Sequence, residues 1–145
     1  NKHKKNEIVS KLIDDEQRKE LDTIESCFKF KRACELSKKI TTEKLKRFKD
    51  DNKKICGYAA TAKSTTVLNY CNIGNDMIDY ICDTTEEKIG KFSPGVHIPV
   101  VPVNKFHEDI PNIAFLFAWN HKEEIFNKEK GFKENGGIWF SHVTL

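Results

Sequence analysis

A run of small, hydroxyl-bearing and basic residues follows a short apolar segment near the middle of the chain. The small residues let a backbone come close to a ligand, and the helix expected next offers unpaired N–H groups and a partial positive charge at its first turn. Lysine and hydroxyl side chains at such a helix start suit an anion, and phosphate above all. The residues that we expect to bind it are Gly57, Tyr58, Ala59, Thr61, Ala62, Lys63, Ser64, Thr65, Thr66 and Asn69.

Other interpretations of this turn remain open. From Gly57 to Ser64 it differs by one residue from the Walker A pattern, because Ala62 stands in place of the second glycine. A nucleotide hydrolase would also need an acid for magnesium and a way to position water. Asp83 is a candidate acid, but the rest of that machinery is not recognisable. The turn is also not G-x-G-x-x-G, and an ordinary strand-to-helix connection is the simplest alternative.

Four further residues are expected near the same ligand. Asp83 closes an apolar segment, where it either accepts hydrogen bonds from ribose hydroxyls or starts a turn. Lys88 opens a segment with two glycines and two prolines, which either flanks the ligand or forms a rigid surface connection. Trp119 is suited to stack on a base or sugar, and Asn120 either bonds a polar edge or caps the next helix.

No nucleophile–base pair, metal-ligand set or pair of carboxylates stands out in the sequence. We therefore assign no catalytic residue and no metal ligand. The pattern is typical of a binder of a phosphorylated ligand rather than of a complete enzyme.

The elements that must position these residues alternate between strand and helix from about residue 53. Continuous apolar strands separated by helices predict a parallel sheet covered on both faces. The expected fold is an α/β, Rossmann-like three-layer sandwich with a mostly parallel sheet and its ligand at the carboxyl ends of the strands. We expect strands at residues 55–58, 77–82, 96–101, 113–118 and 138–143, and helices at about 64–73 and 122–133.

The first 52 residues contain no glycine or proline and follow a helical periodicity. They predict one short and one long helix, with a break around residues 14–17. We expect two parts, an N-terminal helical segment over residues 1–52 that packs on a domain over residues 53–145. Because the only methionine is Met77, we expect the chain to be the C-terminal part of a longer protein.

Bulk composition excludes several classes of protein. The chain is 38% hydrophobic and 32% charged, as in an ordinary globular domain, and no apolar run is long enough to cross a membrane. The basic balance of residues 1–54 (17 Lys and Arg against 11 Asp and Glu) suits solvated helix faces, and no recognition motif indicates a nucleic acid. Five cysteines without C-x-x-C spacing argue against zinc and favour the cytoplasm.

Taken together, these segments resemble the C-terminal domain of SAM-dependent C-methyltransferases that act on nucleotide-linked deoxysugars. The family pattern is approximately G-Y-G-A-x-A-K-G-N-T-x-L-N-Y-x-x-I, D-Y-x-x-D, K-x-G-x-x-x-P-G-x-x-I-P-V, A-W-N and G-G. The matching segments are collinear in this chain and lie at residues 57–73, 79–83, 88–100, 118–120 and 136–137. The chain departs from the pattern at Ala59, where the family has glycine, and at Ser64-Thr65, where it has Gly-Asn.

The resemblance implies that this domain binds a nucleotide-diphosphate sugar. It also implies that S-adenosylmethionine, a structural zinc and the catalytic base belong to upstream domains, so that no cofactor is expected in this chain. The lost glycines affect how closely the backbone wraps the diphosphate, and the added hydroxyls are suited to donate to it. The alternative is a non-catalytic Rossmann-like module that binds another phosphorylated ligand, such as coenzyme A, or a protein partner.

Overall fold

The computed structural model describes residues 6–144, which form two compact units; one ends at Leu36 and the other begins at Ser37. In the first unit, α1 (Glu7–Arg18) starts after Asn6, whose side chain accepts a hydrogen bond from the Ile8 N–H. The long helix α2 (Ile24–Asp50) begins in the first unit and ends in the second. The expected domain boundary after residue 52 stays a prediction.

The break expected at residues 14–17 is wrong, because α1 continues through them to Arg18. Asp15 pairs with Arg18 and Lys19 one turn further on, and such pairs stabilise acidic residues inside a helix. The chain turns instead at Glu20, which has a φ of 54°.

The second unit is built on a five-stranded parallel sheet, which confirms the α/β prediction. Its strands are β1 (Ile55–Tyr58), β2 (Ile81–Asp83), β3 (Val100–Pro102), β4 (Ile113–Leu116) and β5 (Ile138–Phe140). They lie in the order β3-β2-β1-β4-β5, and every neighbouring pair is parallel. All residues of β1, β2 and β4 are buried, as expected of strands covered on both faces.

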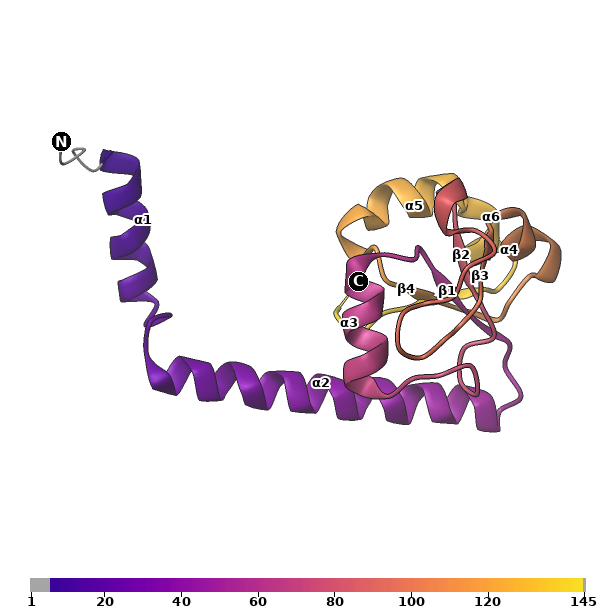
Figure 1. Ribbon diagram of the computed structural model, residues 1–145, viewed down its shortest axis with the longest axis horizontal. Coiled ribbons are helices and arrows are strands. Elements are labelled where there is room, and N and C mark those ends of the chain that lie inside the picture. Colours follow the sequence, from indigo (N-terminus) through magenta and orange to yellow (C-terminus); the bar gives the residue numbers. More distant parts are fainter. Residues whose placement is uncertain (1–5, 145) are drawn as a thin grey trace. The chain divides into compact units, whose positions relative to one another are not determined.

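Helices cover both faces of this sheet and complete the three layers (Figure 1). On one face, Leu45 of α2 and Leu68 of α3 (Ala62–Cys71) join the core around Phe115. On the other, Phe106 and Phe132 pack against the sheet. They belong to α4 (Asn104–Asp109) and α6 (Lys130–Glu134), and α5 (Lys122–Lys128) lies beside them.

Several elements are shorter than predicted. The second strand begins only at Ile81, because the N–H groups of Met77 and Ile78 turn back to the Gly74 carbonyl. The expected helix over residues 122–133 is two helices, since the backbone of Glu129 (φ −106°, ψ 35°) departs from helical geometry. Two 3₁₀ turns, η1 (Glu86–Lys88) and η2 (Trp119–His121), follow β2 and β4.

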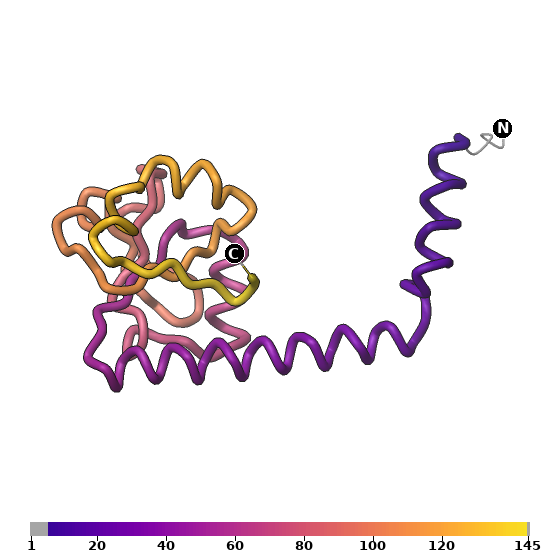
Figure 2. The backbone as a smooth tube through the Cα atoms, turned by 180° about the vertical axis from the view of Figure 1, so that it is seen from behind, coloured from indigo at the N-terminus to yellow at the C-terminus, as the bar shows by residue number. Residues whose placement is uncertain are grey.

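The C-terminal segment, yellow in Figure 2, returns to α2, where the Ser37 hydroxyl donates to the His142 carbonyl at 2.9 Å. Three of the cysteines, Cys56, Cys71 and Cys82, are buried, whereas Cys27 is exposed. Among residues 6–144, no group of His, Cys, Asp and Glu side chains is arranged to hold a metal ion. No helix in this range is both long and apolar enough to span a bilayer.

Candidate functional site

The strand order creates a crevice at the carboxyl end of β1. After β1 the chain builds β2 and β3 on one side of it and then crosses to β4 on the other. In open parallel sheets, ligands bind where the strand order reverses in this way. The turn after β1, taken with the first residues of α3 as residues 59–65, lies at this point. It contains six of the ten residues expected to hold phosphate.

This turn is fixed by three local features. Ala59 has a φ of 72°, a left-handed conformation that favours glycine, which explains why the family pattern has glycine there. Thr61 caps α3, because its hydroxyl oxygen accepts from the Ser64 N–H at 3.2 Å. The first N–H groups of α3 have no acceptor within the helix, so this end of α3 suits an anion.

Asp83 ties the turn to the end of β2. Its carboxylate accepts hydrogen bonds from the N–H of Ala60 at 2.6 Å and of Thr85 at 2.8 Å, and lies 3.4 Å from the ammonium of Lys88. Burial raises the pKa of this carboxyl, but the bonds from Thr85 and Ala60 and the charge of Lys88 outweigh it and hold the pKa below its ordinary value. Asp83 is thus an ionised brace of the turn.

A cavity of about 380 Å³, the lysine pocket, opens at the amino end of α3 and is lined by Lys88, Lys91 and Glu87. Hydroxyls of the first helical turn lie on one side of it, and two lysines and an exposed phenylalanine lie on the other. The residues that define it are Thr61, Ser64, Thr65, Lys88, Lys91 and Phe92. Ser64 is buried and its hydroxyl donates to the Thr61 carbonyl at 2.6 Å, so this hydroxyl proton is bound within the first turn of the helix.

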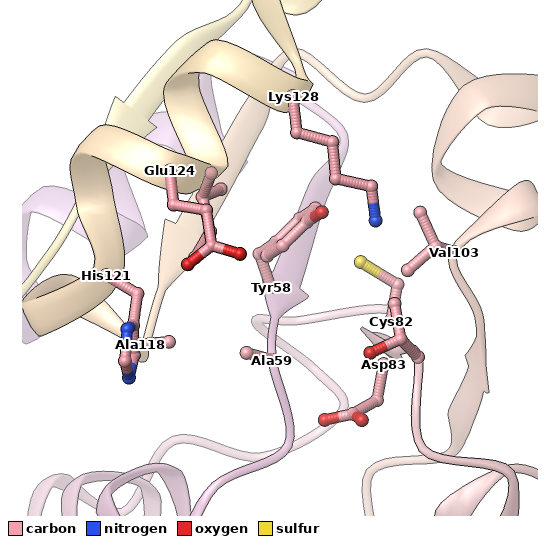
Figure 3. A pocket seen from close by; sticks show the side chains of 11 residues that line it. Tyr58, Ala59, Cys82, Asp83, Val103, Ala118, His121, Glu124 and Lys128 are labelled. Carbon is pink, nitrogen blue, oxygen red and sulfur yellow. The ribbon is translucent and has the colours of Figure 1, made fainter.

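A second cavity of about 320 Å³, the crevice pocket, lies on the α5 side of the turn, over the carboxyl ends of β1 and β2. Figure 3 shows the Glu124 carboxylate and the Lys128 ammonium directed from α5 into it, above Tyr58. Its wall therefore carries hydrogen-bonding groups of both charges. The residues that define it are Tyr58, Asp83, Ala118, His121, Glu124 and Lys128.

Behind the crevice pocket, a buried carboxylate joins three elements. Glu129 is 5% exposed, and its two oxygens lie 2.8 Å from the Tyr58 hydroxyl and 2.7 Å from Nε2 of His107. Burial and the Glu129 carboxylate raise the pKa of Tyr58, so its hydroxyl stays protonated and donates. The bond fixes the last residue of β1, directly before the turn.

The structure brings some of the predicted site residues together and leaves others apart. Gly57 lies inside β1, where a Cβ atom would come within 2.8 Å of the Phe117 ring. Lys63 and Thr66 are exposed on α3, and the amide of Asn69 donates to the Pro94 carbonyl. Trp119 and Asn120 line neither the lysine pocket nor the crevice pocket.

The capping role considered for Asn120 is wrong. Asn120 lies within η2, and the residue that precedes α5 is His121, which makes no side-chain capping bond. The chain continues from β4 through a 3₁₀ turn, so that the helix starts two residues after Asn120.

Lys91 and Phe92 lie in the segment opened by Lys88, which was considered as a flank of the ligand, but neither was assigned to the site. The residues not assigned from the sequence also include His121, Glu124, Lys128 and Glu129. One signal was available for two of them: Glu124 and Lys128 are four residues apart, which places them on one face of the helix after the third strong strand. Nothing local in the sequence marks Glu129, whose partners come from 22 and 71 residues away.

Comparison of the sequence with known proteins identifies a family. The chain is 39% identical over 87 residues to the C-methyltransferase NovU of Streptomyces niveus, a match that covers 60% of this chain and 21% of that protein. The chain thus corresponds to about a fifth of the length of that relative. The sequence model of the C-methyltransferase C-terminal domain matches residues 1–143. The chain therefore belongs to the C-methyltransferase C-terminal domain family.

Proposed function

We propose that this chain is the nucleotide-sugar-binding domain of a SAM-dependent sugar C-methyltransferase. The observation that carries the proposal is the lysine pocket, in which the amino end of α3 faces Lys88 and Lys91. The helix amino end and the Lys91 ammonium complement the charge of a diphosphate, whereas the Lys88 ammonium also lies 3.4 Å from the Asp83 carboxylate. Membership of the C-methyltransferase family supports the link from such a ligand to methyl transfer.

The proposed roles follow from these positions. The turn of residues 59–65 and the lysines hold the diphosphate, with Lys63 adding charge at the exposed first turn of α3. Asp83 holds the turn in place by accepting a hydrogen bond from the Ala60 N–H, and Glu129 holds Tyr58 by accepting from its hydroxyl. Trp119 and Asn120, at the exit of β4, remain proposed contacts for the outer part of the ligand.

The remaining parts of the reaction belong to the proposed upstream methyltransferase domain in the cytoplasm. S-adenosylmethionine bound there supplies the methyl group to a carbon next to a keto group of the deoxysugar. In this proposal the chain binds the nucleotide sugar and contains no cofactor site. The proposed partners include neither nucleic acid nor membrane. A structural zinc is also proposed for the upstream region.

The rival function is a non-catalytic module that binds another phosphorylated ligand, such as coenzyme A, or a protein partner. Because the lysine pocket alone suits any phosphate, the two functions are distinguished by whether the chain binds nucleotide sugars more tightly than other phosphorylated ligands. A full-length gene with an upstream cysteine-rich segment and a glycine-rich methyltransferase motif would favour the C-methyltransferase.

The Lys91→Ala protein is expected to bind a nucleotide-diphosphate sugar about 1–3 kcal/mol more weakly than the native chain, because an ammonium lining the phosphate pocket is lost. Isothermal titration calorimetry with a panel of nucleotide sugars measures the change, with S-adenosylmethionine as a ligand expected not to bind. Lys53→Ala is the matched control, since Lys53 is an exposed lysine just before the opposite end of β1.

Two results would contradict the proposal. One is a native chain that binds none of the nucleotide sugars, and the other is an equal loss of affinity in Lys91→Ala and Lys53→Ala. Tighter binding of coenzyme A than of any nucleotide sugar would favour the rival function.

A further inference from the structure

We infer that the nucleotide sugar lies across the turn after β1 in one direction, with its nucleobase on Phe92 in the lysine pocket and its sugar in the crevice pocket. The inference rests on the proposed function, because it takes the diphosphate to lie at the amino end of α3. It adds the polarity of the ligand and the residue that receives the base.

The two pockets lie on opposite sides of the turn. The lysine pocket lies on the α3 side of the turn, between the amino end of this helix, η1 and Val100 of β3. The crevice pocket lies on the α5 side, over the ends of β1 and β2, and is closed by α5 and Val103. A diphosphate centred on the turn therefore has one cavity available for each of its two substituents.

Phe92 gives the lysine pocket its flat apolar surface. Its side chain is 63% exposed although it lines the cavity beside Lys88 and Lys91. A nucleobase stacked on an exposed aromatic ring removes apolar surface from water, and every base has a face that can do so. The lysines next to the ring suit the phosphate attached to that same nucleoside.

The backbone around Phe92 is held rigidly, so the ring is a prepared surface rather than a loose side chain on a free loop. Phe92 and Pro99 form an antiparallel bridge. On either side of it, the Lys91 carbonyl accepts from the Val100 N–H and the Ser93 N–H donates to the Ile98 carbonyl, both at 2.8 Å. A surface that is ordered before binding costs less entropy when the ligand arrives.

This segment is also tied to α3. The amide of Asn69 donates to the carbonyls of Thr65 and Pro94, at 2.8 and 2.9 Å. Gly95 makes the approach possible: its φ is 86°, and a Cβ atom there would lie 1.9 Å from Oδ1 of Asn69. The phosphate-binding helix and the Phe92 segment therefore keep a fixed spacing.

The crevice pocket has the opposite character. Its exposed polar groups are those of Thr84, His121, Glu124 and Lys128, which can accept from and donate to the hydroxyls of a sugar. The Glu124 carboxylate repels a phosphate but accepts hydroxyl protons well. Figure 3 shows Glu124 directed into this cavity. These groups fit a sugar better than a base or a second phosphate.

The test compares ligands that differ only by the nucleoside or only by the hexose. Affinities are measured by calorimetry for inorganic pyrophosphate, for the diphosphates of uridine, thymidine, cytidine, adenosine and guanosine, and for the hexose conjugate of the tightest of these. Phe92→Leu is expected to lower the affinity for the nucleoside diphosphate and for its conjugate by at least about fivefold, and to leave the affinity for pyrophosphate unchanged. Phe92→Trp should restore both affinities. Phe30→Leu makes the same substitution at another exposed phenylalanine and should change nothing.

Glu124→Ala supplies the second half of the test. It is expected to lower the affinity for the hexose conjugate several-fold and to leave the affinity for the nucleoside diphosphate unchanged. The reverse pattern, in which Glu124→Ala weakens the nucleoside diphosphate and Phe92→Leu weakens only the conjugate, would overturn the polarity. An unchanged affinity in Phe92→Leu would overturn the role of the ring while leaving the proposed function intact. If the native chain binds no conjugate at all, the proposed function itself fails.

Discussion

The Gly57→Val protein is expected to lose about 3 kcal/mol of unfolding free energy relative to the native chain. A Cβ atom at this position would lie 2.8 Å from the Phe117 ring and 2.9 Å from Ile81, and both side chains are fully buried. Closely packed cores respond to added carbon atoms with off-rotamer side chains and backbone shifts. Urea unfolding followed by circular dichroism measures the loss.

Ala59→Gly is the matched control, two residues further along the same motif. Ala59 has a φ of 72°, which costs a residue with a Cβ atom roughly 1–2 kcal/mol. Glycine relieves this cost but gains freedom in the unfolded chain, worth about 0.4–1 kcal/mol, so the variant should be neutral or slightly more stable. Equal destabilisation by Gly57→Val and Ala59→Gly would show that the two small residues do not have the separate roles described.

The Glu129→Ala protein is expected to lose about 2–4 kcal/mol, because it leaves the buried Tyr58 hydroxyl without its acceptor. Glu129→Gln should lose much less, since its amide oxygen can still accept from Tyr58. Adding Tyr58→Phe to Glu129→Ala should recover part of the stability, because the unpaired hydroxyl is then gone. A double-mutant cycle from chemical denaturation gives the coupling between the two side chains.

A coupling near zero in that cycle would contradict the role of Glu129 as the brace of Tyr58. If the coupling is large and Glu129→Gln keeps native affinity for a nucleotide sugar while Glu129→Ala does not, the brace also positions the turn after β1. This second readout separates positioning of the turn from simple stability.

The strands of this fold were readable in the sequence because they are buried on both faces. The first strand was predicted at its observed bounds, since Ile55 and Cys56 begin an apolar run bounded by charged residues and by a turn. The second was predicted four residues too early, because Met77 and Ile78 are as apolar as a strand but their N–H groups bond back to the Gly74 carbonyl. Apolar content predicts burial well, and it distinguishes poorly between a buried strand and a buried turn.

The candidate site could be located in the sequence where its residues lie close together, in the turn after the first strand, and at Asp83, which closes the next one. The Thr61 cap was not predicted, because the helix was expected to begin at about residue 64 and α3 begins at Ala62. Glu129 was not predictable, because its importance comes from the tertiary contacts with Tyr58 and His107. Gly57 was assigned to ligand approach, but its neighbours Phe117 and Ile81 give it a packing role that only the sheet reveals.

The distribution of the cysteines allows local unfolding of this protein to be followed by thiol alkylation. Cys27 is exposed, whereas Cys56, Cys71 and Cys82 are buried, and burial raises the pKa of the Cys56 and Cys71 thiols. Alkylation requires a thiolate in contact with the reagent, so the buried groups react only when the sheet or α3 comes apart. The mass added to each peptide during timed exposure to iodoacetamide then reports which layer of the domain opens first, without any engineered label.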